Sequence, residues 1–306
     1  MTSKAWMAKR AIAVMLAASA SLLLVGCKPS ASPTTSPSDG KISIVASTSV
    51  WGSVAEAIGG DLVEVTSIID SASMDPHSYS ATARDRLAVN QADIVVMNGG
   101  GYDDFMQSLV DQDDTPAITI DAFQAAGDDQ TRNEHIFYDF VQVQDVAAVI
   151  AGAIEAVDAS TFDEGQANFE AFKQQLEGLT AMSAGIMTNL DNPDVVLTEP
   201  VAAYLLTSMG FHDVTPASFT RAIEEEREVP PLALKDVQDK ITYALINFLA
   251  LNPATVTAQT EALKTFAITN GVAVLEFGEL PPENTNYIDW MTANVVQVRK
   301  LAGIGQ

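Results

Sequence analysis

The chain has 306 residues, of which 47% are hydrophobic and 18% are charged, and it contains one cysteine. This length is enough for two lobes of ordinary size with a sizeable core. Its 16 Lys+Arg against 40 Asp+Glu give a formal net charge of -24 at pH 7. Such a field repels nucleic acid and anionic lipid headgroups and attracts cations. The composition therefore argues against a nucleic-acid-binding protein, but acidity alone is weak evidence for a metal site because acidic faces commonly serve solubility.

The N-terminal segment has the pattern of an export signal. Residues 4–10 include three basic side chains, and residues 11–25 form an apolar run that is short for a transmembrane span. The run ends in Leu24-Val25-Gly26-Cys27, which resembles a bacterial lipobox. A lipobox implies a signal peptide over residues 1–26, cleavage before Cys27 and attachment of lipid to its sulfur. An ordinary secretory signal with an incidental cysteine is the alternative.

Residues 28–39 are mainly Ser, Pro, Thr and Ala and have no apolar face. Such a segment cannot bury enough surface to fold. We therefore interpret residues 27–40 as a disordered tether, anchored through lipid on Cys27 to the extracytoplasmic face of the cell membrane. Because the only cysteine is then used for anchoring, no disulfide within the chain is expected.

Residues 41–158 alternate between strand-like and helix-like segments, and we expect them to form an N-terminal lobe. Strands are expected at 42–48, 62–69, 94–97 and 117–120, and helices at 50–58, 85–92, 102–110 and 141–157. This alternation predicts an α/β fold with an open parallel sheet flanked by helices.

A stiff polar turn holds the first candidate ligand, His77. Pro76 fixes its own φ and pushes Asp75 into an extended conformation, so the imidazole leaves the backbone in a reproducible direction. Thr82 is expected to cap the next helix, with Asp85 at the capping-box distance. His77 thus lies at the exit of a βα unit, where open α/β sheets place their ligands. We interpret it as a metal ligand, although an isolated histidine is more often a structural group.

The longer run around this turn resembles a known family. Asp75-Pro76-His77-Ser78-Tyr79, followed by Ala92-Asp93-Ile94-Val95-Val96-Met97-Asn98-Gly99-Gly100, is similar to the zinc/manganese family of solute-binding proteins that serve ABC importers. The resemblance covers nearly the whole mature chain. It implies two lobes, each with a parallel β-sheet flanked by helices, joined by a long bridging helix (cluster A-I type).

The same resemblance implies a function without catalysis. We expect a monomer that captures Mn2+ or Zn2+ in the cleft between its lobes and delivers it to the permease of an ABC transporter and its ATPase. The metal is a transported ligand in this interpretation, and no nucleic acid is bound.

The second candidate ligand, His135, follows a polar, turn-rich segment. The resembled family carries Asn-Pro-His-x-Trp here, whereas this chain reads Asn133-Glu134-His135-Ile136-Phe137. Proline has become glutamate and tryptophan has become phenylalanine. A capping or surface histidine before a helix is the alternative.

Residues 159–191 are expected to form the bridging helix. Apolar side chains from Phe162 to Leu190 recur mostly at steps of three, four or seven, which places them on one helical stripe. A helix of about thirty residues would be roughly 45 Å long, more than one small lobe needs. A plain core helix with a loop near Gly178 is the alternative.

Residues 192–306 repeat the alternation and are expected to form a C-terminal lobe. Strands are expected at 195–197, 244–250 and 271–275, and helices at 200–209, 231–243 and 257–267. Glu199 stands between the first strand and helix, and Pro200 suits the first helical position. The family carries histidine or glutamate here, and Thr198 to Leu205 resembles its glutamate branch, which favours manganese. Alternatively, Glu199 only stabilises the helix dipole.

The family places its fourth ligand, Asp or Glu, just before the final helix. Glu279, which precedes Leu280-Pro281, fits that place. Glu276 is the rival, three residues nearer the strand. We leave His212 out of the site because it follows Gly210-Phe211 in a turn, and we expect the run Glu224 to Glu228 to be a solvated loop.

Two imidazoles and two carboxylates, from His77, His135, Glu199 and Glu279, suit manganese or zinc. A membrane-tethered metal-dependent hydrolase would need an open coordination position and a general base, and typically a helical His-Glu-x-x-His, which the sequence lacks. An adhesin, a lipoprotein that binds no metal, is a further alternative.

Overall fold

The computed structural model describes residues 40–113, 115–127, 133–225 and 227–304. The expected signal peptide, the lipid-anchor residue Cys27 and the tether up to residue 39 lie outside the described residues.

The first half of the described chain forms a parallel sheet with strand order β2-β1-β3-β4. Its strands are β1 (Ile42–Thr48), β2 (Val63–Ile69), β3 (Ile94–Met97) and β4 (Ile118–Asp121). All four residues of β3 are buried, as expected for a strand with helices on both faces. The register pairs Ile44 of β1 with Ile94 of β3. The four predicted strands are therefore present to within one residue at each end.

Helices and short 3-10 segments connect these strands. They are α1 (Ser49–Gly59), η1 (Gly60–Leu62), α2 (Ala83–Gln91), α3 (Asp104–Asp113), α4 (Ala122–Ala125), η2 (Ile136–Tyr138) and α5 (Phe140–Val157). The capping box at the start of α2 is present: the Thr82 hydroxyl accepts from the Asp85 N–H, and the Asp85 carboxylate accepts from the Thr82 N–H at 2.7 Å. These bonds fix the end of the His77 loop, as predicted.

Helix α5 is long and apolar enough to cross a membrane by length and composition alone. Its buried residues include Val143 and Ile150, and it packs against α1 and α6. We therefore interpret it as a core helix.

The second half forms another parallel sheet with strand order β6-β5-β7-β8. Its strands are β5 (Asp194–Leu197), β6 (His212–Asp213), β7 (Phe248–Leu251) and β8 (Ala273–Glu276). Numbered within its own half, each sheet has the order 2-1-3-4. In such sheets ligands bind beyond the carboxyl ends of the strands, where the strand order reverses.

The remaining elements are η3 (Ala159–Thr161), α6 (Phe162–Ser183), η4 (Ile186–Asn189), α7 (Ala203–Ser208), α8 (Ala217–Glu224), α9 (Pro231–Thr242), α10 (Ala258–Thr269) and α11 (Tyr287–Leu301). The strand expected over 244–250 was placed too early, because α9 ends in a Schellman turn. The Leu245 N–H donates to the Lys240 carbonyl at 2.9 Å, and Ala244 has φ 51°. The strand β7 can begin only after this turn.

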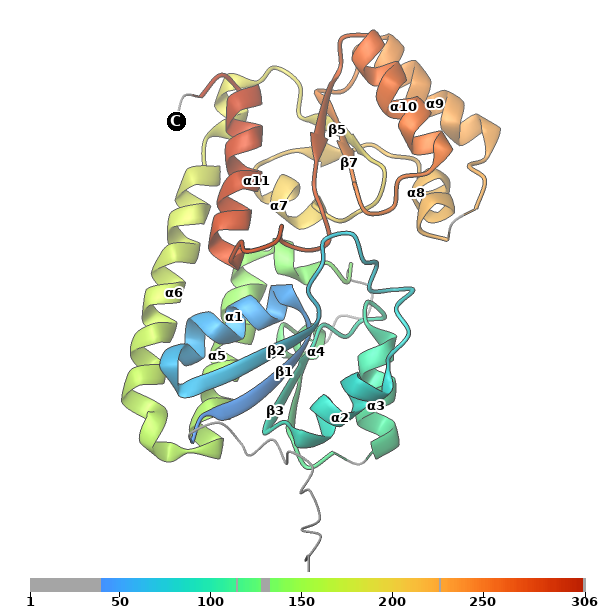
Figure 1. The fold of residues 1–306 in the computed structure, drawn as a ribbon. Coiled ribbons are helices and arrows are strands. Elements are labelled where there is room, and N and C mark those ends of the chain that lie inside the picture. The colour runs from blue at the N-terminus through green and yellow to red at the C-terminus, as the bar shows by residue number, and fades with distance from the viewer. Residues whose placement is uncertain (1–39, 114, 128–132, 226, 305–306) are drawn as a thin grey trace, which may run out of the picture. The chain divides into compact units, whose positions relative to one another are not determined.

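The helix expected over 159–191 is shorter than predicted. Continuous α-helix covers only α6, because Gly185 at φ 77° turns the chain into the 3-10 segment η4. Helix α6 packs against α1, α5 and α11, and Figure 1 shows α6 and α11 side by side. The chain thus leaves the second sheet through α11 and returns to the helices of the first half.

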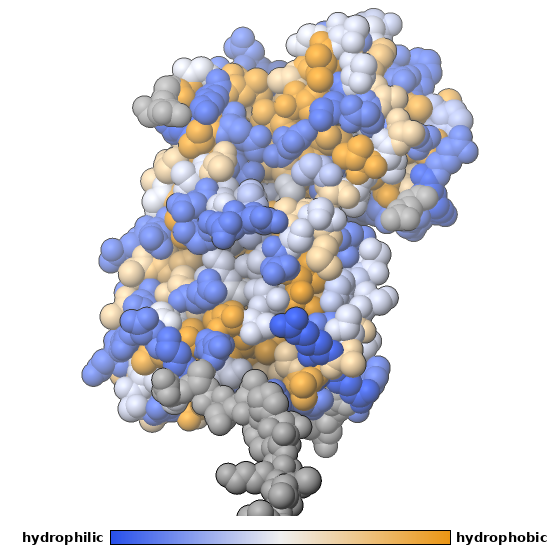
Figure 2. Space-filling model, viewed as in Figure 1, coloured by the Kyte–Doolittle hydropathy of each residue, from blue (hydrophilic) through white to orange (hydrophobic). Residues whose placement is uncertain are grey.

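Two hydrophobic clusters hold the fold together. The larger one fills the first sheet and its helices and continues through Trp290 into the second half, where it includes Phe248 and Phe277. The smaller one lies between the second sheet and helices α8 to α10, around Phe219 and Val237. Hydrophilic and hydrophobic residues are intermixed over the face visible in Figure 2.

Replacing Tyr287 with phenylalanine should lower the free energy of unfolding by about 1–3 kcal/mol, because it leaves a buried carbonyl without its donor. The Tyr287 hydroxyl donates to the Phe137 carbonyl at 2.7 Å, and the tyrosine is 1% exposed. Urea unfolding would measure the change. Tyr243→Phe is the matched control, because Tyr243 is 69% exposed and should leave stability unchanged. Equal stabilities of the parent and both variants would contradict this prediction.

Candidate metal-binding site

His77 lies on the loop between β2 and α2, in the predicted turn. Its N–H donates to Asp75 Oδ1 at 2.9 Å, and Pro76 between them is buried. The imidazole is exposed and meets the Tyr102 ring edge-on, with ring centroids 5.1 Å apart. A local turn and edge-on contacts with the Tyr102 and His135 rings thus orient the imidazole.

His135 is almost fully buried, with 2% exposure, and it directly precedes η2. Asn133 Oδ1 accepts from its backbone N–H at 2.9 Å and lies 2.6 Å from its Nδ1. Because an amide oxygen only accepts, Nδ1 must carry a proton, and Nε2 is the nitrogen left to face a cation. The family's proline is absent, but the two contacts with Asn133 restrain His135 in its place.

Glu279 lies between β8 and α11 and is 3% exposed. Its Oε1 accepts from Asn252 Nδ2 at 3.0 Å. His135 Nε2 lies 3.3 Å from Oε1 and 3.1 Å from Oε2. Oε2 accepts no hydrogen bond, and it contacts the His135 imidazole as an ion pair.

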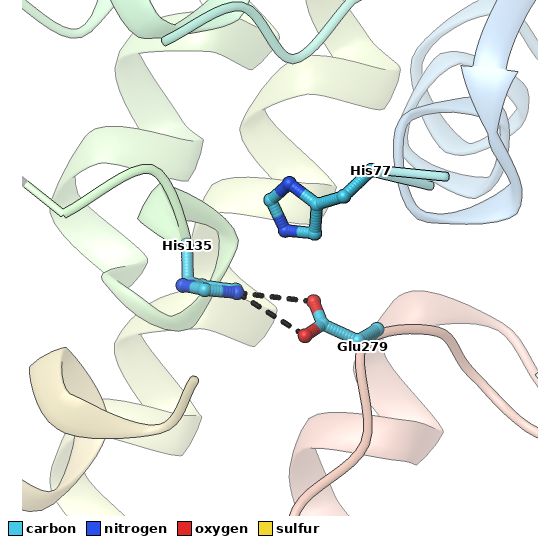
Figure 3. Close-up of side chains that lie close together, drawn as sticks. All are labelled: His77, His135 and Glu279. Atoms are coloured by element: carbon cyan, nitrogen blue, oxygen red, sulfur yellow. Dashed lines mark hydrogen bonds and ion pairs between the residues drawn. The ribbon is translucent and has the colours of Figure 1, made fainter. Parts of the chain in front are cut away.

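His77, His135 and Glu279 converge on one point. Each offers a ligand atom, and these atoms all lie within 4.8 Å of one another. Figure 3 shows the three side chains pointing toward one another from three separate segments. The rival carboxylate, Glu276, instead forms an ion pair with Lys264 Nζ at 2.8 Å. Of the two alternatives left open by the sequence, the structure brings Glu279 into the cluster.

The fourth candidate, Glu199, lies in the same cavity but outside this cluster. It is 9% exposed and sits between β5 and α7. Its Oε2 accepts a hydrogen bond from the Thr255 hydroxyl. The expected helix starts three residues late, at Ala203, because Pro200 belongs to a turn closed by the Ala203 N–H at 3.1 Å.

The cavity between the two halves has a volume of about 350 Å³. Its wall is mostly polar and acidic: Asp75, His77, Gly100, Gly101, Glu134, His135, Glu199, Ile223, Glu224, Thr255 and Glu279. A space of this kind admits a hydrated cation and discourages an anion.

Glu224 is exposed, as expected for a solvated residue, but it lies in a helix rather than a loop. It is the last residue of α8 and lines the cavity. Burial raises its pKa, and the neighbouring Glu134 raises it further. Its neighbour Ile223, buried on the inner face of α8, is the only local signal that could have placed it there. His212 lies in β6 rather than a turn, is exposed, and faces Asp194 at 3.6 Å, away from the cavity.

The charges in the cavity strongly affect one another. Burial alone would lower the pKa of His135, but attraction to Glu279, Glu134 and Glu199 raises it to about 9. Burial would raise the pKa of Glu279, but His135 and His77 hold it below its usual value. Burial raises the pKa of Glu199 to about 7, and the Glu279 charge adds to this. Before a cation binds, His135 and Glu279 therefore form a buried ion pair.

Known proteins resemble this chain in sequence and in fold. The family model described as zinc-uptake complex component A, periplasmic (ZnuA) matches residues 44–301. The manganese-binding lipoprotein MntA of Halalkalibacterium halodurans is 26% identical over 239 residues, which cover 72% of this chain and 79% of that protein.

Two solved structures share the two-sheet architecture. The periplasmic zinc-binding protein TroA from Treponema pallidum has a TM-score of 0.73 at 16% identity, over 87% of this chain and 100% of that one. The laminin-binding protein Lmb of Streptococcus agalactiae is described as having adhesin and metal transporting activity. It has a TM-score of 0.71 at 21% identity, over 85% of this chain and 99% of that one. These likenesses confirm the predicted α/β fold with two parallel sheets.

The family match covers most of the described chain, and it agrees with the motif around His77 on which the resemblance was based. The protein therefore belongs to the ZnuA family of metal-binding solute-binding proteins of ABC importers.

Proposed function

We propose that the protein captures Mn2+ or Zn2+ in the cavity between its two halves and delivers it to the permease of an ABC transporter and its ATPase. The observation that carries this proposal is the convergence of His77, His135 and Glu279 within 4.8 Å. Two imidazoles and a carboxylate are donors that suit both metals. The names of the relatives, which include manganese- and zinc-binding proteins, support the same ligand class.

The proposed ligands are His77, His135, Glu199 and Glu279. His135 offers Nε2, because Asn133 occupies its Nδ1 side. Glu279 offers Oε2, a buried oxygen that accepts no hydrogen bond. An unsatisfied carboxylate oxygen is costly in a dry site, and a bound cation would remove that cost. Glu199 is the fourth donor from the same cavity wall.

The protein acts as a carrier rather than an enzyme in this proposal, as the transport role of its family supports. It is a monomer held at the extracytoplasmic face of the cell membrane by lipid on Cys27, and the relatives named as lipoproteins support this location. The description of Lmb combines adhesin activity with metal transport, so it supports adhesion beside metal binding and not an adhesin that binds no metal.

Removing a proposed ligand should weaken metal binding without unfolding the protein. His77→Ala should lower the affinity for both metals by roughly 100-fold or more, since even the outer partners of ligands contribute about 10–100-fold. Titration calorimetry on chelator-stripped protein would measure it. His212→Ala is the matched control, because that histidine is exposed on β6. If the His77 variant bound as tightly as the parent, the ligand assignment would be abandoned.

Metal affinity should rise with pH up to about 9. The cation must replace a proton on His135, whose pKa is about 9, and below about pH 7 it must also displace one from Glu199. The logarithm of the affinity should therefore increase by about one per pH unit between 7 and 9, and more steeply below 7. Calorimetry at pH 8 in two buffers of different ionisation enthalpy counts the released protons. Finding no released proton would contradict the prediction.

Replacing Cys27 with serine should release the protein from membranes, because the segment 28–39 has no apolar anchor of its own. Fractionation of cells expressing the parent and the variant would measure this. The soluble variant should still bind metal, which separates the anchor from the site. Retention after detergent-free washing of a variant that has also lost residues 1–26 would disprove the lipid anchor.

A further inference from the structure

One loop contacts both carboxylates that the second half contributes to the cavity. It runs from the end of β7 to the start of α10, over residues 252–257. Asn252 Nδ2 donates to Glu279 Oε1 at 3.0 Å, and the Thr255 hydroxyl donates to Glu199 Oε2. The protein therefore already holds one oxygen of each carboxylate in a hydrogen bond.

The orientation of Asn252 is fixed on all sides. The side chain is 3% exposed, and its Oδ1 accepts from the Ala254 N–H at 3.0 Å. Its own N–H donates to Thr198 Oγ1 at 3.2 Å. Because Oδ1 is used in the loop, the amide cannot be reversed, and its NH₂ group must face Glu279. The loop therefore determines which oxygen of Glu279 stays available.

The available oxygen faces the cluster. Glu279 Oε2 accepts no hydrogen bond and lies 3.1 Å from His135 Nε2. On Glu199, the Thr255 hydroxyl donates to Oε2, and the Asn252 amide also interacts with this carboxylate. The loop thus restrains both carboxylates, which would offer four oxygens to a cation if they were unrestrained, and it leaves Glu279 Oε2 without a hydrogen bond.

We propose that Asn252 and Thr255 are positioning residues that limit each carboxylate to one metal-binding oxygen and thereby set the preference between cations. This inference rests on the proposed function of the cavity. Zinc is satisfied by four donors, whereas manganese belongs with the ions that take about six, mostly oxygens. The loop therefore favours zinc over manganese relative to the same cavity without these two donors.

The test compares the affinities for the two metals. Thr255→Val keeps the shape of the side chain and removes the hydroxyl, so Glu199 Oε2 becomes free. We expect the ratio of zinc to manganese affinity to fall by about tenfold, the lower end of the effect of an outer partner on a metal ligand. Thr255→Ala should give the same change, and Asn252→Ala should act in the same direction through Glu279. Calorimetry with MnCl₂, and with ZnCl₂ against a competing chelator, measures both affinities.

Two controls separate positioning from stability. Thr255→Ser retains the hydroxyl and should restore the parent ratio. Thr269→Val, on the exposed side of α10, should change neither affinity. Thermal unfolding of each metal-free variant checks that the fold is intact.

The outcomes are distinct for the two proposals. If the parent binds neither metal, the proposed function and this inference both fail. If the parent binds both metals but the ratio stays within about twofold in Thr255→Val, Thr255→Ala and Asn252→Ala, the inference alone fails. An equal loss for both metals would likewise show a merely structural loop and overturn it.

Discussion

The interaction on which the site depends is the buried ion pair between His135 and Glu279. It joins the segment that follows α4 in the first half to the segment that follows β8 in the second. Burying two charges is costly, and the cost is met only when the remaining polar atoms are hydrogen-bonded. Asn133 does this for the imidazole and Asn252 for the carboxylate. Neither asparagine donates a hydrogen bond to Glu279 Oε2, and this oxygen faces His135 in the cluster.

Because of this ion pair, His135 carries a proton that a binding metal ion must replace. The raised pKa of His135 means that its stabilising contribution is fully present below about 6.5, its ordinary value, and is lost as pH rises through about 9. The lowered pKa of Glu279 has the opposite sign, so its contribution is present above 4.5 and is lost as pH falls through its folded value. Below about pH 7 Glu199 also carries a proton, and throughout this range the metal-free cavity keeps the additional proton on His135. A divalent cation that takes its place adds charge to a wall rich in carboxylates.

Local signals explain what the sequence could predict. The capping box at Thr82, the turn around Pro76 and the apolar strand β3 depend on neighbours in the chain, and all three are present. The errors arise where tertiary contacts decide: Glu224 reaches the cavity because α8 lies against it. The roles of Asn252 and Thr255 could not be inferred, because their partners are 27 and 56 residues away in the chain.

The repeated strand order explains why the cavity needs both halves. In each sheet the candidate side chains follow the carboxyl ends of parallel strands: His77 follows β2, Glu199 follows β5 and Glu279 follows β8. Neither half alone supplies more than two of the four candidate donors. Two donors cannot satisfy a divalent cation that needs four or more. Cation binding and the contact between the halves are therefore linked, because each stabilises the other by the same coupling free energy.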